Sequence, residues 1–267
     1  MRWLWLLALP LCGETFDHGD WDRILKESVS EIGEVDYARL KANPGPLAAY
    51  VARLAVASPE NRPELFRTRE EQLAYWINAY NALTTYGVAL KYPTGSVKDL
   101  GFLFGFFRRD DYVLGGRKLS LMTLENKVIR ARYAEPRIHF AIVCASLSCP
   151  KLSRTAYTGE NLNAQLEFQV RQYFRERRNL EVDAKANRVT LAAILDWYKE
   201  DFEKFIGGAA PRALLEYARR YTSLEQQREM DGLRAPKVVF RDYDWSINDP
   251  MSRLRAKSAE ERELGKR

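Results

Sequence analysis

Reactive side chains are scarce in this 267-residue sequence, which contains two histidines, three cysteines and four methionines. Only the first dozen residues form a continuous apolar run, and that run is too short to span a bilayer. The chain has no internal repeat and no long linker. Hydrophobic residues make up 46% and charged residues 29% of the sequence, which is ordinary globular usage and excludes a globally disordered chain.

The positive charge of the chain is concentrated at its carboxyl end. The formal net charge is +6, and residues 251–267 hold six basic and three acidic side chains, so half of the excess lies in this tail. The densest basic cluster before the tail is Arg175, Arg177 and Arg178, which we interpret as a solvated helix end. No basic stripe marks the body of the chain, and we expect no nucleic-acid partner.

The amino end resembles a secretory signal peptide. Arg2 is followed by an apolar stretch that ends at Pro10 and Gly13, a pattern that also fits a buried first helix. We assign residues 1–15 to a signal, which predicts a periplasmic or secreted protein that contacts the membrane only during targeting. Cys12 keeps a lipoprotein open as an alternative, although Leu11 stands where lipidation sites need a small residue.

The strongest helix signal covers residues 68–91. Thr68 and Glu71 form a capping box, and Tyr92-Pro93 stops the helix. Asn78 and Asn81 fall beside or on its apolar face, where a buried amide needs hydrogen-bond partners. We therefore expect these two side chains to tie a neighbouring loop or strand to the helix.

The remaining elements are shorter. The sequence predicts helices over residues 21–29, 47–57, 120–133, 160–175, 193–205 and 211–221, and strands over residues 112–114, 117–119, 137–145, 188–191 and 237–240. Helices outnumber strands, and the strands come mainly as hairpins. We predict one α+β domain over residues 16–249, helix-rich with a small and mainly antiparallel sheet, followed by a charged tail over residues 250–267.

Most of the unusual chemistry lies between residues 125 and 149. Glu125 is on or beside the apolar seam of its helix, where a carboxylate needs a partner, and His139 in the following strand is a natural one. Such a pair can hold a base for a thiol, which Cys144 or Cys149 would supply. Each residue also has a structural interpretation: Glu125 as a surface carboxylate, His139 as a structural histidine, Cys144 as a core cysteine and Cys149 as a loop thiol.

Strand geometry separates the two cysteines. Side chains alternate along a strand, so His139 and Cys144 face opposite sides if residues 137–145 form a regular strand. Cys149 follows a turn-like segment, and Pro150 after it favours an extended loop conformation. We predict Cys149 as the exposed, reactive thiol and Cys144 as a supporting or buried residue.

Four separated segments resemble the "domain of unknown function 547" family. They are residues 72–82, 115–121, 137–150 and 243–248, in the family's order over nearly the whole chain. Bacterial members are typically exported single-domain proteins, and the family has been likened to papain-type and transglutaminase-type cysteine enzymes. The resemblance therefore implies a cysteine-protease-like fold with a Glu-His-Cys-Cys tetrad of Glu125, His139, Cys144 and Cys149. One departure is Asn126, where members often have a histidine, because asparagine cannot act as a base near neutral pH.

Three functions stay open at this point. The first is a cofactor-free, monomeric cysteine hydrolase or acyltransferase acting on an unknown small-molecule, peptide or amide substrate. In it Cys149 attacks, His139 accepts the proton and Glu125 orients the imidazole. Backbone N–H groups of residues 145–149, or the amides of Asn78 and Asn81, would stabilise the oxyanion.

The other two functions use the cysteines differently. A zinc site would take His139, Cys144 and Cys149 as ligands, although the chain lacks the second cysteine pair that zinc motifs usually have. A non-catalytic binding or redox protein would instead form a Cys144–Cys149 disulfide. Four intervening residues permit that closure, and an oxidising compartment favours it.

Overall fold

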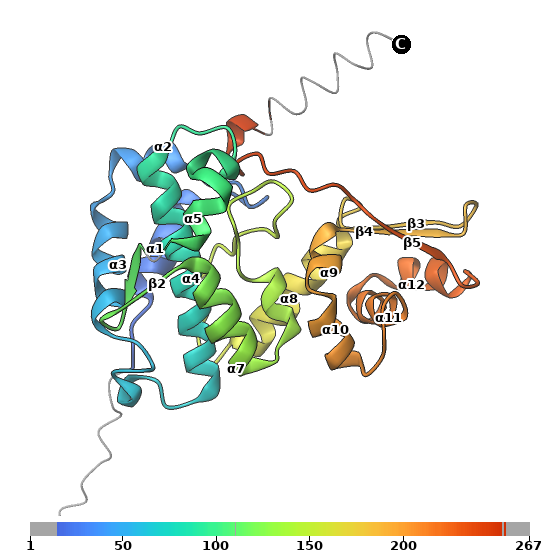
Figure 1. Ribbon diagram of the computed structural model, residues 1–267, viewed down its shortest axis with the longest axis horizontal. Coiled ribbons are helices and arrows are strands. Elements are labelled where there is room, and N and C mark those ends of the chain that lie inside the picture. Colours follow the sequence, from blue (N-terminus) through green and yellow to red (C-terminus); the bar gives the residue numbers. More distant parts are fainter. Residues whose placement is uncertain (1–14, 110, 253, 255–267) are drawn as a thin grey trace, which may run out of the picture.

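The computed structural model describes residues 15–109, 111–252 and 254, and Figure 1 shows them coloured along the sequence. Residues 1–14, with Cys12, and most of the tail over residues 250–267 lie outside the described residues, so the signal and the tail stay predictions. Within the described ranges, no helix is both long and apolar enough to cross a membrane.

The first part of the chain is helical and surrounds a long central helix, α4 (Figure 1). Its helices are α1 (Gly19–Ser28), α2 (Tyr37–Ala42), α3 (Gly45–Val56), α4 (Arg69–Lys91), α5 (Gly105–Arg108), α6 (Leu121–Thr123) and α7 (Ala131–Tyr133). Three 3-10 turns, η1 (Pro63–Leu65), η2 (Val97–Leu100) and η3 (Phe102–Phe104), lie between them, and a π-helical segment, η4 (Leu124–Arg130), joins α6 to α7. The helix expected over residues 120–133 therefore exists but contains a wide turn.

Helix α4 begins at the predicted capping box, in which Thr68 accepts a hydrogen bond from the N–H of Glu71 and the Glu71 side chain accepts one in return. Most of its side chains between residues 73 and 89 are buried rather than one face alone, because α2, α3, η4 and α8 (Leu162–Arg175) all contact it. A helix covered on all sides carries its polar side chains into the protein interior.

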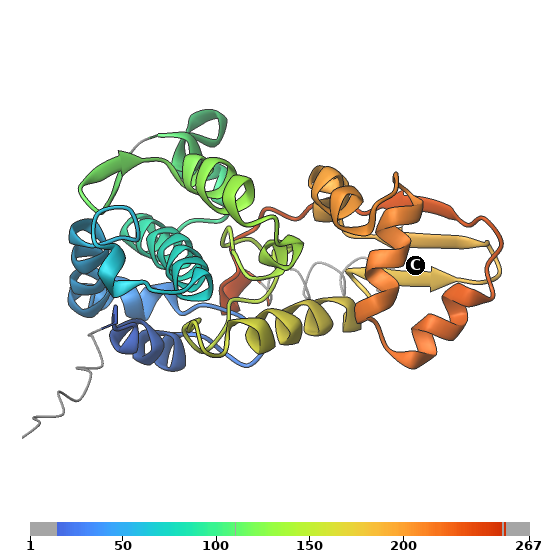
Figure 2. The same cartoon turned by 90° about the horizontal axis from the view of Figure 1, so that it is seen from below.

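Buried apolar side chains form two clusters. The first lies around α4, and the second contains Phe140 together with residues from α8 and from the part of the chain that follows it. Helix α8 contributes Leu162 and Leu166 to the first cluster and Val170 and Phe174 to the second. Figure 2 shows this helix running from the helical part toward the three-stranded sheet. Helix α8 thus joins the two clusters into one molecule.

The second cluster is covered by helices and a small sheet. The helices are α9 (Ala193–Trp197), α10 (Lys199–Ile206), α11 (Arg212–Tyr221) and α12 (Leu224–Asp231), and the strands are β3 (Leu180–Asp183), β4 (Arg188–Leu191) and β5 (Lys237–Phe240). Strand β4 pairs with β3 in antiparallel and with β5 in parallel orientation. In the first part, β1 (Tyr112–Leu114) and β2 (Arg117–Leu119) form the predicted antiparallel hairpin, with Gly115 and Gly116 both at positive φ. The predicted helix-rich α+β fold with small, mainly antiparallel sheets is confirmed.

The predicted strand over residues 137–145 is wrong. Pro136–Phe140 is a 3-10 helix, η5, whose start is fixed by Pro136 and by the Glu135 carboxylate, which accepts a hydrogen bond from the N–H of Arg137. The segment passes between the two clusters, with Ile138 in the first and Phe140 in the second. Because it is buried on several sides, its continuous apolar pattern resembles that of a buried strand.

After β5 the chain returns to the first cluster. Residues 243–249, the return segment, make isolated β-bridges through Ser246 to Ser96 and through Ile247 to Ser146. The hydroxyl of Tyr37 donates to the side chain of Asn248 at 2.8 Å. Figure 1 shows this segment crossing from the sheet end of the molecule back to the helical end. The last described part of the chain therefore spans both clusters.

Candidate active site

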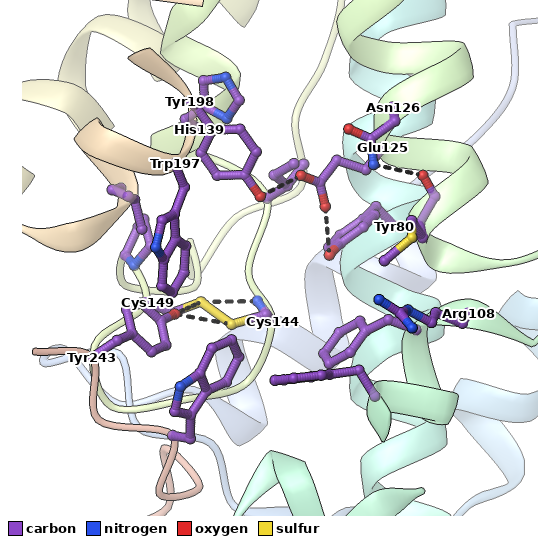
Figure 3. A pocket seen from close by; sticks show the side chains of 17 residues that line it. Tyr80, Arg108, Glu125, Asn126, His139, Cys144, Cys149, Trp197, Tyr198 and Tyr243 are labelled. Carbon is purple, nitrogen blue, oxygen red and sulfur yellow. Dashed lines mark hydrogen bonds between the residues drawn. A yellow bond between two sulfur atoms is a disulfide. The ribbon is translucent and has the colours of Figure 1, made fainter. Parts of the chain in front are cut away.

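A cavity of about 240 Å³ lies where η4, η5, α9 and the return segment meet, and Figure 3 shows its lining side chains. Seven of the lining residues are aromatic. Glu125, His139, Cys144 and Cys149 all line it, as does Asn126. The structure thus brings together every residue of the tetrad implied by the resemblance, although not in the pairing expected.

Glu125 lies in the wide turn of η4 and is buried. Its Oε2 accepts a hydrogen bond from the hydroxyl of Tyr80 at 3.2 Å, and its Oε1 accepts one from the hydroxyl of Tyr198 at 2.5 Å. The expected pairing of this carboxylate with His139 is therefore wrong. A carboxylate on a helix seam needs buried donors, and here two tyrosines supply them.

The carboxylate partner of His139 is Asp201, in α10. His139 Nε2 lies 2.8 Å from Asp201 Oδ2, and Arg130 Nε donates to the same oxygen at 2.7 Å. Burial on its own would raise the pKa of Asp201, but the hydrogen bonds from His139 and Arg130 outweigh it and hold that pKa well below its usual range. Sequence reasoning missed Asp201, because nothing local marks a residue 62 positions away as a partner of His139.

His139 is held as a neutral imidazole. Burial lowers its pKa, and the neighbouring carboxylates of Asp201 and Glu125 oppose this effect without cancelling it. With Nε2 donating to Asp201, Nδ1 is the unprotonated nitrogen, and it is buried without a hydrogen-bond partner among the described residues. The ring is stacked on that of Tyr198, which occupies the break between α9 and α10 where one helix was expected.

Cys144 and Cys149 form a disulfide across a tight loop, with Cα atoms 6.4 Å apart. Ala145 enters the loop in the left-handed region at φ +67°, and the N–H of Cys149 closes it onto the carbonyl of Ser146 at 3.1 Å. Cys149 is buried and Cys144 is half-buried. The prediction that Cys149 is the exposed sulfur is wrong, because the turn points Cys149 back under the backbone of Cys144.

The two sulfur atoms share the hydroxyl of Tyr243, which lies 3.1 Å from each of them. Cys149 Sγ also accepts from the backbone N–H of Cys144 at 3.0 Å, and Cys144 Sγ lies 3.1 Å from Ser146 Oγ. The Tyr243 oxygen in turn accepts from Ser146 Oγ at 2.8 Å. Burial raises the pKa of Tyr243 far above the neutral range, so its hydroxyl keeps its proton and remains a donor.

The cavity has two chemically distinct walls. Trp197, Tyr243 and Trp245 contact one another, with ring centroids 4.4 to 5.6 Å apart, and stand beside the disulfide. Figure 3 shows Glu125 and Arg108 on the opposite side. Trp197 is 47% exposed, so this aromatic wall reaches the mouth of the cavity.

The three candidate supporting residues are asparagines with structural contacts. Asn78 donates to the carbonyl of Tyr157 and accepts from its N–H, and Asn81 does the same with the carbonyl of Ala141 and the N–H of Val143. The prediction that both tie a loop to the helix is confirmed. Their amides are engaged with the backbone rather than directed into the cavity, which leaves their expected oxyanion role without support.

Asn126 donates to the carbonyl of Met122 at 3.0 Å and accepts from Arg130 at 2.5 Å. It therefore positions the arginine that holds Asp201. Within the described part of the chain, no group of three or more His, Cys, Asp or Glu side chains is placed to hold a metal ion. The zinc alternative consequently has no ligand set among these residues.

Fold and site together define an α+β domain with a cysteine pair set into an aromatic pocket. Residues 65–174 match the model of the family described as "Protein of unknown function, DUF547", and this match supports the assignment of the chain to that family. The matched segment contains Glu125, His139, Cys144 and Cys149, whereas Asp201 and Tyr243 lie beyond it. No curated protein and no solved structure matches the chain.

Proposed function

We propose that the pocket carries out thiol–disulfide exchange at the Cys144–Cys149 pair. The observation that carries this proposal is the unequal burial of the two cysteines. Both cysteines line the cavity, but Cys144 is half-buried, whereas Cys149 is buried and accepts a hydrogen bond from the backbone N–H of Cys144. Exchange needs one accessible sulfur to attack and one sulfur that leaves readily as a thiolate, and hydrogen-bond donors favour the thiolate.

In this proposal a substrate thiolate attacks Cys144 Sγ. A new sulfur–sulfur bond forms between substrate and Cys144, the Cys144–Cys149 bond breaks, and Cys149 Sγ keeps the electron pair as a thiolate. A second substrate thiolate then attacks the substrate sulfur of this mixed disulfide and releases the Cys144 thiolate. In total, two substrate thiols are oxidised to one disulfide and the protein disulfide is reduced to two thiols. The reverse sequence, with a substrate disulfide, closes the pair again.

The test compares Cys149→Ser with Cys144→Ser, each treated with a small disulfide such as cystamine. Mass spectrometry of the native protein after acid quenching measures the mixed disulfide. We expect rapid adduct formation on Cys144 in C149S and slow formation on Cys149 in C144S, because Cys149 is buried. Equal rates in the two variants, or a wild-type disulfide that thiols open only under unfolding conditions, would overturn the proposal.

A second candidate is the cysteine hydrolase or acyltransferase of the reduced protein. It is favoured by one observation, that Glu125, His139, Cys144 and Cys149 line a single cavity. Against it, His139 Nε2 is engaged with Asp201, and no hydrogen bond among the described residues joins the imidazole to either sulfur. Single-turnover acylation of the reduced protein by a chromogenic ester tests it. A burst that disappears in both C144S and His139→Gln would favour hydrolysis.

We also propose that the protein acts outside the cytoplasm. The signal-like amino end supports export, and disulfides persist in oxidising compartments. Cell fractionation, together with mass determination of the mature amino terminus, tests this proposal. An uncleaved chain in the cytoplasm would contradict it.

A further inference from the structure

The size of the cavity limits what can reach the disulfide. Drug-sized ligands occupy pockets of roughly 300–1,000 Å³, whereas this cavity holds about 240 Å³. A small molecule that contacts Cys144 therefore lies in the same cavity as Glu125 and Arg108, which stand on the opposite wall (Figure 3). The groups on that wall then select among small thiols.

Glu125 places an acceptor with spare capacity on that wall. An ionised carboxylate offers about four lone-pair sites, and here two of them are used, by Tyr80 and Tyr198. Aromatic faces around a carboxylate attract a cationic group through the ring quadrupoles as well as through charge. The wall is therefore complementary to a protonated amine.

Arg108 supplies the opposite charge at the edge of the same cavity. Its side chain is exposed and lines the pocket, and within the described residues it makes no hydrogen bond or ion pair. A guanidinium with free donors binds a carboxylate. Glu125 and Arg108 together thus present one site for a cation and one for an anion.

We infer that the substrate of the exchange is a small aminothiol of the cysteine type. Its ammonium group binds Glu125, its carboxylate binds Arg108, and its sulfur faces Cys144. This inference rests on the proposed function for the chemistry, but the recognition of the amine can be measured without it. The net charge of the protein, +6, attracts anionic thiols, so a preference for an amine must come from the local site.

The first experiment measures the rate at which four matched thiols open the Cys144–Cys149 disulfide. The thiols are cysteine, cysteamine without the carboxylate, 3-mercaptopropionate without the amine, and 2-mercaptoethanol without either. Rates are taken at equal thiolate concentration, and each is divided by the rate of the same thiol with a disulfide-closed peptide of residues 142–151. This ratio removes the differences in intrinsic thiol reactivity.

We expect cysteine and cysteamine to exceed the other two thiols by about tenfold or more, as a charge-assisted contact in a buried site implies. We also expect cysteine to react faster than cysteamine, because its carboxylate contacts Arg108. Glu125→Gln is expected to remove the advantage of the two amines, and Arg108→Gln to remove only the advantage of cysteine over cysteamine. Glu31→Gln is the matched control, because the Glu31 side chain is 89% exposed and is not among the residues that line the cavity. If all four ratios are equal, the proposed exchange stands and the inference fails.

The second experiment measures binding without chemistry. The thioethers S-methylcysteine, 2-(methylthio)ethylamine and 3-(methylthio)propionate are titrated against tryptophan fluorescence, since Trp197 and Trp245 line the cavity. We expect the two amines to bind more tightly than the acid in the wild type and in E31Q, and the difference to vanish in E125Q. If no thiol opens the disulfide but this order holds, the proposed function fails and the amine site stands. Equal or tighter binding of the acid overturns the inference.

Discussion

The imidazole of His139 lies face to face with the ring of Tyr198, with ring centroids 4.0 Å apart and the planes inclined by 21°. The same tyrosine donates its hydroxyl to Glu125 at 2.5 Å. Tyr198 therefore stands between the two residues that the sequence suggests as a direct pair. His139 and Glu125 thus share contacts with this tyrosine, while Asp201 fixes the imidazole at Nε2.

Removing the Tyr198 hydroxyl tests this arrangement. Tyr198→Phe keeps the ring on His139 but takes one of two donors from a buried carboxylate, so we expect a loss of about 1.5–3 kcal/mol in the free energy of unfolding. Urea denaturation measures this change. Tyr86→Phe is the control, because Tyr86 is half-buried and has no hydrogen-bonded hydroxyl among the described residues. Equal small losses in both variants would show that Glu125 does not depend on Tyr198.

Tyr243 is expected to control the reactivity of Cys149. Tyr243→Phe removes the hydroxyl that lies 3.1 Å from both sulfur atoms, so the Cys149 thiolate that leaves is less stable and the disulfide opens more slowly. We expect a decrease of about tenfold in the rate of opening by cysteamine, equivalent to about 1.4 kcal/mol. Stopped-flow thiol trapping measures the rate, and Y86F is again the control. An unchanged rate would mean that the hydrogen bond from the backbone N–H of Cys144 is enough to stabilise the Cys149 thiolate.

Asn81 is expected to be important for stability. Asn81→Ala leaves the carbonyl of Ala141 and the N–H of Val143 without these partners in the interior, and we expect a loss of about 1–3 kcal/mol or more in the free energy of unfolding. Asn163→Ala, at an exposed site on α8, is the matched control and should be nearly neutral. Chemical denaturation of both variants measures the loss in the free energy of unfolding. A neutral N81A would show that the loop holds without the amide.

Acid is expected to destabilise the fold before the carboxylates titrate. Burial lowers the pKa of His18 from 6.5 to about 3, and its Nδ1 lies 2.6 Å from the hydroxyl of Tyr50. Below pH 6.5 the unfolded chain binds a proton that the folded chain does not, so stability is fully present above pH 6.5 and falls as the pH decreases toward 3. Solvent screening of a half-buried ring reduces the effect to about 1–2 kcal/mol between pH 7 and 5.

His18→Asn isolates this contribution, because its amide oxygen can replace Nδ1 as an acceptor without titrating. Urea unfolding at pH 7 and pH 5 should show a smaller decrease in the variant than in the wild type. The remaining decrease should come from His139, whose pKa burial also lowers. The same slope in H18N and wild type would contradict the assignment.

The sequence predicts those features that depend on neighbouring residues. The capping box at Thr68 and the Gly115-Gly116 hairpin follow from local chemistry, and both are confirmed. The prediction of a strand over residues 137–145 is wrong because this segment is buried between two clusters. It therefore lacks the exposed polar positions that would distinguish a 3-10 turn from a strand. The amino-acid types identify the four candidate site residues, but they do not reveal which side chains these residues contact.

The missing information is long-range. Asp201 and Tyr243 lie 62 and 94 positions from the residues they contact, His139 and Cys149. Nothing in the amino-acid types of these segments indicates such contacts, because helix breaks and chain reversals determine them. The break at Tyr198 places α10 beside His139, and the return segment brings Tyr243 to the cysteines.

The return segment also sets an order of events in biosynthesis. Cys144 and Cys149 leave the ribosome, and enter any export channel, well before Tyr243, which follows Cys149 by 94 residues. Until the end of the chain has folded back, the cysteines have neither the tyrosine hydroxyl nor the wall formed by Tyr243 and Trp245. We therefore expect a nascent or truncated chain to expose an ordinary pair of thiols, and the proposed reactivity of the site to arise only when the return segment has folded back.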